Sequence, residues 1–425
     1  MKKIIFLSIC SLIVSFNSAY CEPETPYELD TPPSEVVENP AESNTSVKDS
    51  ITLSSAYFES QYTNKQLANF GLEVVRGMAR LEDFLTSNFD NEEKNTARWC
   101  ARALYILFIH RALNTAYHEI GHGLRAKAYG KDFQLTEHND SGGFKKDQNF
   151  FKFFVKKMGN FSRASCQYEK GLKDEEELVV AAGGMNNETY MAERISRDFH
   201  DRGRLSFAES FAYFYGKLSP VAYALSKSSK NEEADALSSD DPVAVGGYYK
   251  KLGISATKND IALGGLISTL LSGTTYSIIK SAFSPDKYAT PISFYNFQAP
   301  DMFSYVTSKG ISYRLVSAYK YQDDLKFLFG AEHVFHGKST TEVHLGVDTT
   351  LDSSFYNTNL KVVTTFCNGF NLEAACSVPV MDCLSINVEA GTYSCKSMLG
   401  ERHSKNMKDG KGRSTDIAVS ISYRY

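Results

Sequence analysis

The pattern of apolar residues changes at Pro291, and this change constrains the fold more than any other feature of the chain. Before Pro291, apolar side chains recur at helical spacing, whereas after it they alternate with polar ones in short segments separated by turn residues. Roughly eight such segments lie between Ser293 and Tyr425, which is enough strands for a small β-barrel. The sequence therefore predicts an α+β protein, with a mainly helical domain followed by an antiparallel β-domain or barrel.

The N-terminal segment has the composition of a secretory signal peptide. Two lysines precede an apolar stretch, and small residues follow it. The next thirty or so residues are rich in Pro, Glu, Ser and Thr, and such a segment cannot bury enough apolar surface to fold. We therefore expect a signal peptide over 1–21, a disordered linker over 22–51, a helical domain over 52–290 and the β-domain over 291–425. The alternative for the first segment is an N-terminal membrane anchor.

The net charge bears on the class of partner, and the cysteines bear on whether disulfides form. The 425 residues carry a net charge of only -4, so no basic excess indicates a nucleic-acid partner. Several cysteines lie outside the signal segment. Because we expect the chain to be exported, these cysteines can form disulfides. The local pairs Cys367–Cys376 and Cys383–Cys395 are the disulfides that we expect.

The strongest chemical signal is the stretch AYHEIGHGLRAKAYG at residues 116–130. On a helix, His118 and His122 lie on one face about one turn apart, and both can bind one metal ion. Glu119 follows the first histidine and can take a proton from a zinc-bound water. The alternative is an amphipathic helix whose two histidines are satisfied by hydrogen bonds.

This motif helix resembles that of the site-2-protease-like metalloproteases, which often read HExGHxxxAxxxG. The resemblance implies an integral-membrane zinc endopeptidase, and it assigns the roles of ligand, base and ligand to His118, Glu119 and His122. The second metal motif of that family, an Asp in a Leu-Asp-Gly type sequence, is absent from this chain. Its third ligand is therefore not carried over.

A catalytic zinc site needs a third protein ligand. The metzincin pattern is excluded, because Arg125 and Ala128 stand where its glycine and third histidine would fall. The best candidate is Glu188 in AAGGMNNETYMAERI, a segment similar to the third-ligand helix of zinc proteases in the heat-shock and prenyl-protein protease group. Its double glycine would allow close packing on the motif helix. The alternatives for the third ligand are Glu193, Asp241, His138 and Asp140.

Two further segments bear on the membrane. Apolar side chains and terminal tyrosines share one face of the last segment, from Ile417 to Tyr425, which resembles the terminal strand of bacterial outer-membrane barrels. That resemblance implies an outer-membrane location, and the alternative is a soluble periplasmic β-domain. Residues 261–279 contain no charge, and their length permits a membrane span. Their glycine and hydroxyl residues favour a buried or membrane-surface helix instead.

The sequence thus predicts an exported, zinc-dependent metallopeptidase of a Gram-negative bacterium, located in the outer membrane or periplasm. It would hydrolyse peptide bonds in protein or peptide substrates with a Zn²⁺-bound water that Glu119 activates. One alternative is a non-catalytic outer-membrane or surface β-protein whose helical domain is structural. The other is a site-2-like protease within the inner membrane.

Overall fold

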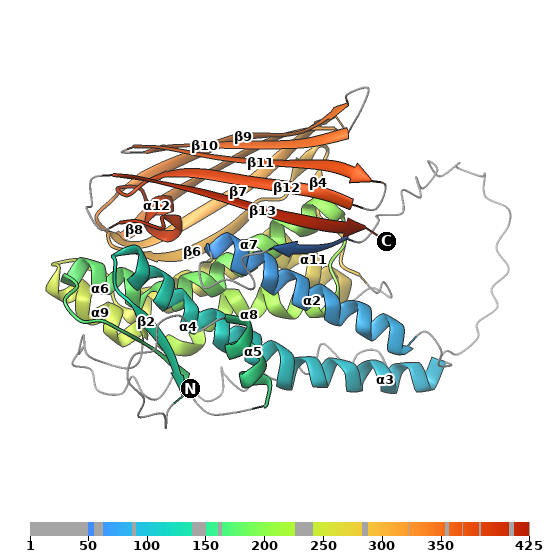
Figure 1. The fold of residues 1–425 in the computed structure, drawn as a ribbon, viewed down its shortest axis with the longest axis horizontal. Coiled ribbons are helices and arrows are strands. Elements are labelled where there is room, and N and C mark those ends of the chain that lie inside the picture. Colours follow the sequence, from blue (N-terminus) through green and yellow to red (C-terminus); the bar gives the residue numbers. More distant parts are fainter. Residues whose placement is uncertain are drawn as a thin grey trace, which may run out of the picture.

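The computed structural model describes residues 50–54, 63–86, 91–137, 150–159, 164–225, 241–282, 288–322, 324–352, 357–367, 369–381, 384–407 and 412–424. The expected signal peptide, nearly all of the expected linker, His138 and Asp140 lie outside these ranges. The described chain forms two layers, a packed group of helices and a large sheet that arches over them (Figure 1).

The helices occupy most of the chain between Asn64 and Ala282, as the helical spacing predicted. Local sequence sets several of their ends. The helix α8 begins at a capping box of Ser206 and Glu209, and α7 ends at Gly203, whose φ of 74° is left-handed. The helices are α2 (Asn64–Thr86), α3 (Asn91–Leu104), a π-helical segment (Tyr105–His110), α4 (Arg111–Ala128), α5 (Phe150–Gly159), α6 (Asp174–Ala181), α7 (Gly183–Arg202), α8 (Phe207–Ala224), α9 (Asp241–Lys251), α10 (Lys258–Leu270) and α11 (Gly273–Ala282).

The sheet has eleven antiparallel strands in the order β1-β13-β12-β11-β10-β9-β8-β7-β5-β4, and β6 also pairs with β7. Apart from β1, its strands follow the helices in sequence, and a short helix α12 (Met398–His403) lies between the last two. A separate two-stranded sheet joins β2 (Phe133–Glu137) to β3 (Ala164–Tyr168) within the helical region. The strands of the large sheet are β1 (Ser50–Ser54), β4 (Ser293–Phe294), β5 (Phe297–Gln298), β6 (Asp301–Thr307), β7 (Gly310–Gln322), β8 (Leu325–Gly337), β9 (Thr341–Asp352), β10 (Asn357–Cys367), β11 (Gly369–Met381), β12 (Leu384–Ser394) and β13 (Arg413–Arg424).

The antiparallel β-region is confirmed, but its closure into a barrel is not. Across the described strands, β1 and β4 end the hydrogen-bonded path and do not pair with each other. The strands β4 and β5 are only two residues long, so they cannot extend the ladder around to β1. Helices such as α2 and α7 lie beneath the arch on its open side (Figure 1). The sheet is therefore open, and helices fill its concave side.

Helices and strands share their apolar cores, although the pattern changes at Pro291. One core joins Leu67, Tyr117 and Phe199 of the helices to Phe303 and Tyr305 of β6. A second core joins residues of α6, α9 and α10 to Val306, Ile311 and Tyr313 of β6 and β7. The border between helical and strand residues thus marks a change of secondary structure within a continuous packed unit.

The uncharged stretch 261–279 is two helices rather than one. The helices α10 and α11 meet at a bend of 62°, and the break carries Ser272. The buried ammonium of Lys217 on α8 donates to the Ser268 carbonyl and the Ser272 hydroxyl at this break. Among the described helices, none alone is long and apolar enough to cross a bilayer, whereas this bent pair together has the length and composition to do so.

The expected disulfides are not formed at the cysteines that the structure describes. Cys376 and Cys395 are free thiols. In the register of β10 and β11, Cys367 stands opposite Gly369, whereas Cys376 stands opposite Leu360. The hairpin thus holds Cys367 and Cys376 at different levels of the ladder, too far apart for a bond. Cys383 lies outside the described residues.

Candidate metal centre

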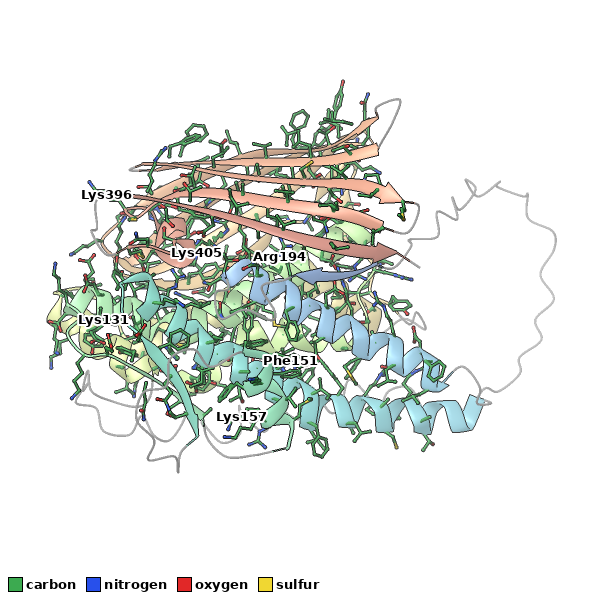
Figure 2. All side chains as sticks on the ribbon, in the orientation of Figure 1. Lys131, Phe151, Lys157, Arg194, Lys396 and Lys405 are labelled. Carbon is green, nitrogen blue, oxygen red and sulfur yellow. The ribbon has the colours of Figure 1, made fainter. Side chains whose placement is uncertain are left out.

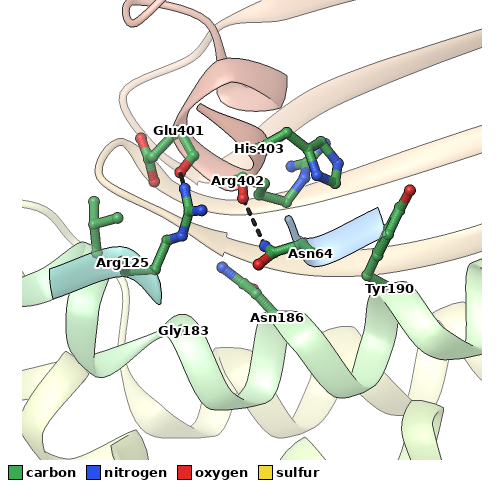
Figure 3. Close-up of a pocket in the computed structure, with 9 residues that line it drawn as sticks. Asn64, Arg125, Gly183, Asn186, Tyr190, Glu401, Arg402 and His403 are labelled. Atoms are coloured by element: carbon green, nitrogen blue, oxygen red, sulfur yellow. Dashed lines mark hydrogen bonds between the residues drawn. The ribbon is translucent and has the colours of Figure 1, made fainter. Parts of the chain in front are cut away.

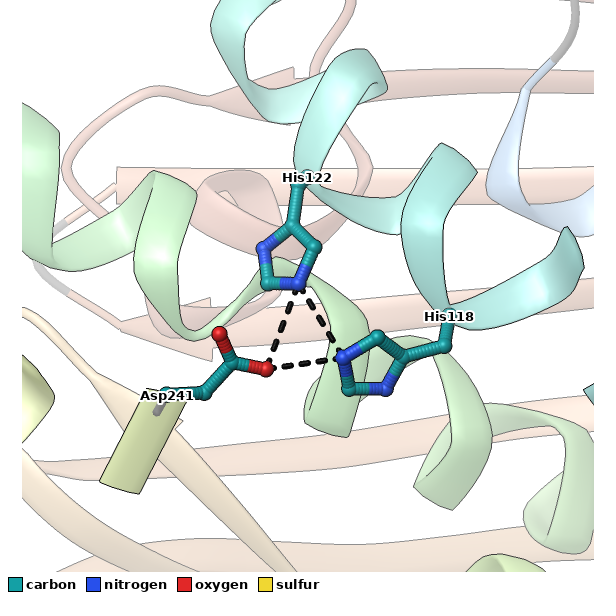
Figure 4. A group of neighbouring side chains, drawn as sticks. All are labelled: His118, His122 and Asp241. Atoms are coloured by element: carbon teal, nitrogen blue, oxygen red, sulfur yellow. Dashed lines mark hydrogen bonds and ion pairs between the residues drawn. The ribbon is translucent and has the colours of Figure 1, made fainter. Parts of the chain in front are cut away.

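The two histidines of the HEIGH motif point their Nε2 atoms at one spot. Both lie on α4 one turn apart, as the motif predicted, and both are buried. The Nε2 atom of His118 is 3.1 Å from the Nε2 atom of His122 (Figure 4). Such proximity brings two strong metal-ligating atoms to the same side of the helix.

The outer nitrogen of each ring fixes its tautomer. Nδ1 of His122 is 2.7 Å from the carbonyl oxygen of Val180, and Nδ1 of His118 is 3.1 Å from Oε1 of Glu188. A carbonyl or carboxylate oxygen can only accept, so each Nδ1 carries the proton. The lone pair of each neutral ring then lies on Nε2, which is the arrangement that metal-binding histidines adopt in proteins.

Asp241, the first residue of α9, supplies a third ligand atom to the same spot. Its Oδ2 atom is 2.7 Å from Nε2 of His118 and 3.3 Å from Nε2 of His122. Three ligands placed tetrahedrally at ~2.0–2.1 Å from a zinc ion would be about 3.3–3.4 Å apart. The observed set of two imidazoles and one carboxylate is close to that spacing, and its donor types suit zinc. His118, His122 and Asp241 could therefore hold a metal ion.

Glycine keeps this space open. A Cβ atom on Gly184 of α7 would lie 2.5 Å from Nε2 of His118 and 2.6 Å from Nε2 of His122. On the same helix, a Cβ on Gly183 would meet the carbonyl of Gly121, and one on Gly121 would meet the carbonyl of Gly183. The prediction that the double glycine allows α7 to pack closely on the motif helix is thereby confirmed.

The charges of the site are strongly coupled. Burial disfavours the charged form of His118, but Glu188 and Asp241 outweigh it and raise the pKa of His118 well above its ordinary value. Burial would raise the pKa of Asp241, yet the two histidines hold it well below its usual range. Because both Nδ1 atoms are donors, a hydrogen bond from either Nε2 to Asp241 requires a second proton on that ring. A cation in the same place would replace that proton.

Glu119 lies beside this group, facing β3. Its carboxylate has a hydrogen bond with the backbone of Cys166 on that strand. Burial raises the pKa of Glu119 above its ordinary value, and the nearby His118 and His122 oppose the rise. A carboxylate with a raised pKa, close to metal-ligating groups, is suited to accept and return a proton. His118, Glu119 and His122 are thus brought together as the motif predicted.

Glu188 occupies a different place from the one predicted for it. It lies behind His118, where its carboxylate accepts from Nδ1 of that ring, from Nδ2 of Asn114 at 2.7 Å and from the hydroxyl of Ser219. Asp241, one of the alternative third ligands predicted from the sequence, lies next to both Nε2 atoms instead. Glu193 faces Arg197, Arg314 and the hydroxyl of Tyr305, away from the histidines.

Tyr223 is a neighbour of the site that the sequence did not single out. Its ring centroid lies 5.1 Å from that of His118. Burial raises the pKa of Tyr223 far above its ordinary value, and the charges of Glu188, Asp241 and Glu119 raise it further. The only sequence signal for it is its position near the end of an aromatic helix.

A second group of possible ligands lies under the sheet. Glu332, Glu342 and His344 are buried on β8 and β9, and their ligand atoms lie close enough for one ion. However, both carboxylate oxygens of Glu332 accept from Arg402 at 2.6 Å, and Nε2 of His344 is 2.9 Å from Nη1 of Arg314. Glu342 accepts backbone N–H groups at the start of α12. Arginine therefore already provides the positive charge here.

A cavity between α7 and α12 is too small for a substrate. Its volume is about 10 Å³, which is room for about one water molecule. It lies where Arg125 donates to the Glu401 carbonyl and Asn64 donates to the Arg402 carbonyl (Figure 3). These bonds tie α12 to α4 and α2, so the cavity is part of the junction between sheet and helices.

No protein-family model, curated protein or solved structure matches this chain.

Proposed function

We propose that the chain is a zinc-dependent metallopeptidase whose ligands are His118, His122 and Asp241 and whose general base is Glu119. One observation carries the proposal. The two Nε2 lone pairs and the Oδ2 atom of Asp241 converge at 2.7–3.3 Å from one another, while the outer nitrogens are held by Glu188 and Val180. A glutamate directly after the first histidine completes the HExxH pattern.

The donor set also supports zinc over harder cations. Calcium and magnesium prefer six or more oxygen ligands, whereas two imidazoles and a carboxylate are typical of catalytic zinc. A zinc ion bound there would supply a Lewis acid for a carbonyl group and would make water more acidic. With three protein ligands, one coordination position is left for the reaction.

The chain's own residues would handle the proton and the geometry. Glu119 would take the proton of the attacking water at its carboxylate and pass it to the leaving amine, so that the carboxylate is regenerated. Glu188 would hold His118 in its tautomer, and the Val180 carbonyl would do the same for His122. Peptides and proteins are the substrate class that this chemistry implies. Export to the outer membrane or periplasm stays a prediction from the sequence.

Glu119→Gln separates catalysis from metal binding. The purified chain should contain close to one zinc and cleave a protein or mixed-peptide substrate, with new N-termini detected by mass spectrometry. In Glu119→Gln we expect the zinc to remain and the cleavage rate to fall by about 10²–10⁴-fold, because the proton acceptor is lost. Glu175→Gln, on the exposed first turn of α6, is the matched control and should change neither quantity.

Two outcomes would contradict the proposal. Equal cleavage rates in Glu119→Gln and Glu175→Gln would remove Glu119 from the reaction. A chain that binds zinc but cleaves none of a proteome-derived peptide library would favour the rival interpretation, in which the helical region is structural and the chain is a non-catalytic surface protein.

A further inference from the structure

The outer face of the large sheet is apolar, and it is exposed. Along β9 the outward side chains include Val343, Leu345 and Val347, of which Leu345 is 50% exposed. Val388 and Val419 stand opposite each other on β12 and β13, and both are exposed. The outward positions of β8 to β13 follow the same alternation, so the apolar surface runs across six neighbouring strands.

The inner face of the same strands is polar, and it is buried. Glu332 and Glu342 are 0% exposed, and His344 is 3% exposed. On β10 and β11, Lys361 pairs with Asp348 at 3.2 Å, and Glu373 pairs with Lys65 of α2 at 2.6 Å. These side chains lie between the sheet and the helices, and each has a partner there.

This distribution is the reverse of that in a water-soluble sheet. An antiparallel sheet in water packs its apolar face on the core and turns its polar face to solvent. Here polar groups face inward and apolar groups face outward with a period of two. That arrangement lowers the free energy only where the outer medium is itself apolar.

The aromatic residues sharpen this interpretation, because they gather at the two ends of the strands. Phe335, Phe366 and Phe370 are exposed at the end formed by the β8–β9 and β10–β11 turns. Tyr321 and Phe327 are exposed at the opposite end, beside the β7–β8 turn. Between these ends the exposed apolar side chains are aliphatic, and the partly buried Phe329 lies opposite Leu345. Aromatic belts on either side of an aliphatic band match the two interfaces and the hydrocarbon core of a bilayer.

Strand length and curvature fit the same medium. The strands β8 to β13 have 11 to 13 residues, and a tilted strand needs about 9–11 residues to cross the hydrocarbon layer. The sheet arches over the helices, with side chains projecting from its convex side (Figures 1 and 2). Two convex arches can touch only along a narrow line, whereas lipid chains can follow the curve.

We propose that the convex face of β8–β13 contacts the hydrocarbon of a lipid bilayer, with the aromatic ends of the strands at its two interfaces. This proposal is independent of the metal chemistry. It concerns the open sheet described above, whose concave side is filled by helices of the same chain.

Tryptophan quenching by brominated lipid tests the contact directly. Trp99 on α3 is first changed to Phe, and a single tryptophan is then placed at Val388 in the middle of the apolar band. The control places it at Lys396, an exposed residue at one end of the sheet (Figure 2). The full chain, extracted in mild detergent, is reconstituted into phosphatidylcholine vesicles with bromine on the acyl chains. We expect several-fold stronger quenching at position 388 than at 396. Equal quenching at both positions would overturn the proposal.

Charge substitution provides the second measurement. The double variant Leu345→Arg, Val388→Arg should lower co-flotation with vesicles roughly thirtyfold or more, since a charge near the midplane is costly. The control variant has the same kind of substitution at exposed residues of α2, outside the sheet: Leu81→Arg, Leu85→Arg. It should change flotation far less. Near-UV circular dichroism checks that both variants fold. Unchanged flotation of the sheet variant would overturn the proposal. A dimer that forms without detergent, buries Val388 and does not bind vesicles would overturn it as well.

Discussion

The two buried clusters of potential metal ligands differ in what surrounds them. In the helical region, a carboxylate and a carbonyl hold the outer nitrogens of His118 and His122, and the inner nitrogens face each other and Asp241. Glu332 and His344 under the sheet face the guanidinium groups of Arg402 and Arg314. The first cluster carries its positive charge as a proton on a histidine, which a metal ion can replace, whereas the second contains arginines, whose charge is fixed.

This difference shows that ligand proximity alone does not define a metal site. A metal ion must replace a proton or occupy a space between lone pairs, and Gly184 leaves such a space beside the two histidines. Under the sheet, an added divalent ion would have to displace paired arginines from a buried region, and unpairing them is costly. The same residue types thus serve two purposes, according to whether a fixed positive charge is already present.

Metal content should separate the two clusters most strongly. We expect the double variant His118→Ala, His122→Ala to retain no zinc after it is loaded with zinc and the unbound metal is dialysed away, because two of three ligands are gone. The double variant Glu332→Gln, His344→Ala should keep close to one zinc per chain. Mass-spectrometric metal analysis of both proteins checks this. If the sheet variant lost the zinc and the helix variant kept it, the assignment of the two clusters would have to be exchanged.

The free energy of unfolding should depend on the cluster under the sheet, whereas the zinc content depends on the histidine cluster. Glu332→Gln leaves the buried Arg402 without the carboxylate that accepts from its Nη1 and Nη2 atoms. Breaking one side of such a pair costs about 3–5 kcal/mol in the free energy of unfolding. Denaturant unfolding of the detergent-solubilised protein measures the loss.

An exposed ion pair is the matched control for that measurement. Lys251 and Asp174 lie 3.5 Å apart with their side chains about half exposed, and Asp174→Asn should cost under about 1 kcal/mol. Equal losses in Glu332→Gln and Asp174→Asn would show that the network under the sheet does not stabilise the fold.

Local features of the site could be predicted from the sequence because helix geometry determines them. Spacing of four places His118 and His122 on one face, and the double glycine indicates close contact with α4. Period-two alternation likewise predicted the strands after Pro291. In each case the relevant neighbours lie within one element, or the residue type itself limits the packing.

Tertiary features could not be predicted in the same way. Asp241 reaches the histidines from α9 only because the helices between them pack as they do. Whether Glu188 meets the inner or the outer nitrogen of His118 depends on the rotation of α7, which no spacing specifies. Nor did composition indicate that Ser50–Ser54 would pair with β13, since a short polar strand gains its partner from the rest of the sheet.

Glu188 provides a finer test of the helical cluster. We expect Glu188→Gln to weaken zinc binding by about 10–100-fold, as loss of a carboxylate that orients a histidine does elsewhere. Asp241→Asn should weaken it more, because a direct ligand loses its charge. Competition with a fluorescent chelator gives both affinities, and Glu175→Gln is the control. A larger effect of Glu188→Gln than of Asp241→Asn would restore Glu188 as the third ligand.

Lys217 provides the smallest and most specific test, since no carboxylate among the described residues contacts its buried ammonium. Its ammonium donates to the carbonyls of Ser268 and Met302 and to the hydroxyl of Ser272, all neutral groups. Burial lowers the pKa of Lys217 to about 7, and the more distant charges of Asp301 and Glu193 only partly oppose it. The arginines under the sheet differ because carboxylates contact them.

A lowered lysine pKa has a definite sign in the stability profile. Between pH 7 and 10.5 the unfolded chain keeps the proton of Lys217 while the folded chain has lost it, so stability rises with pH across that window. We expect a gain of about 2 kcal/mol between pH 7 and 9 that Lys217→Met lacks. Denaturant unfolding at several pH values measures it. Parallel profiles for the two proteins would mean that Lys217 stays charged when folded, and that neutral acceptors hold a buried cation as well as carboxylates do.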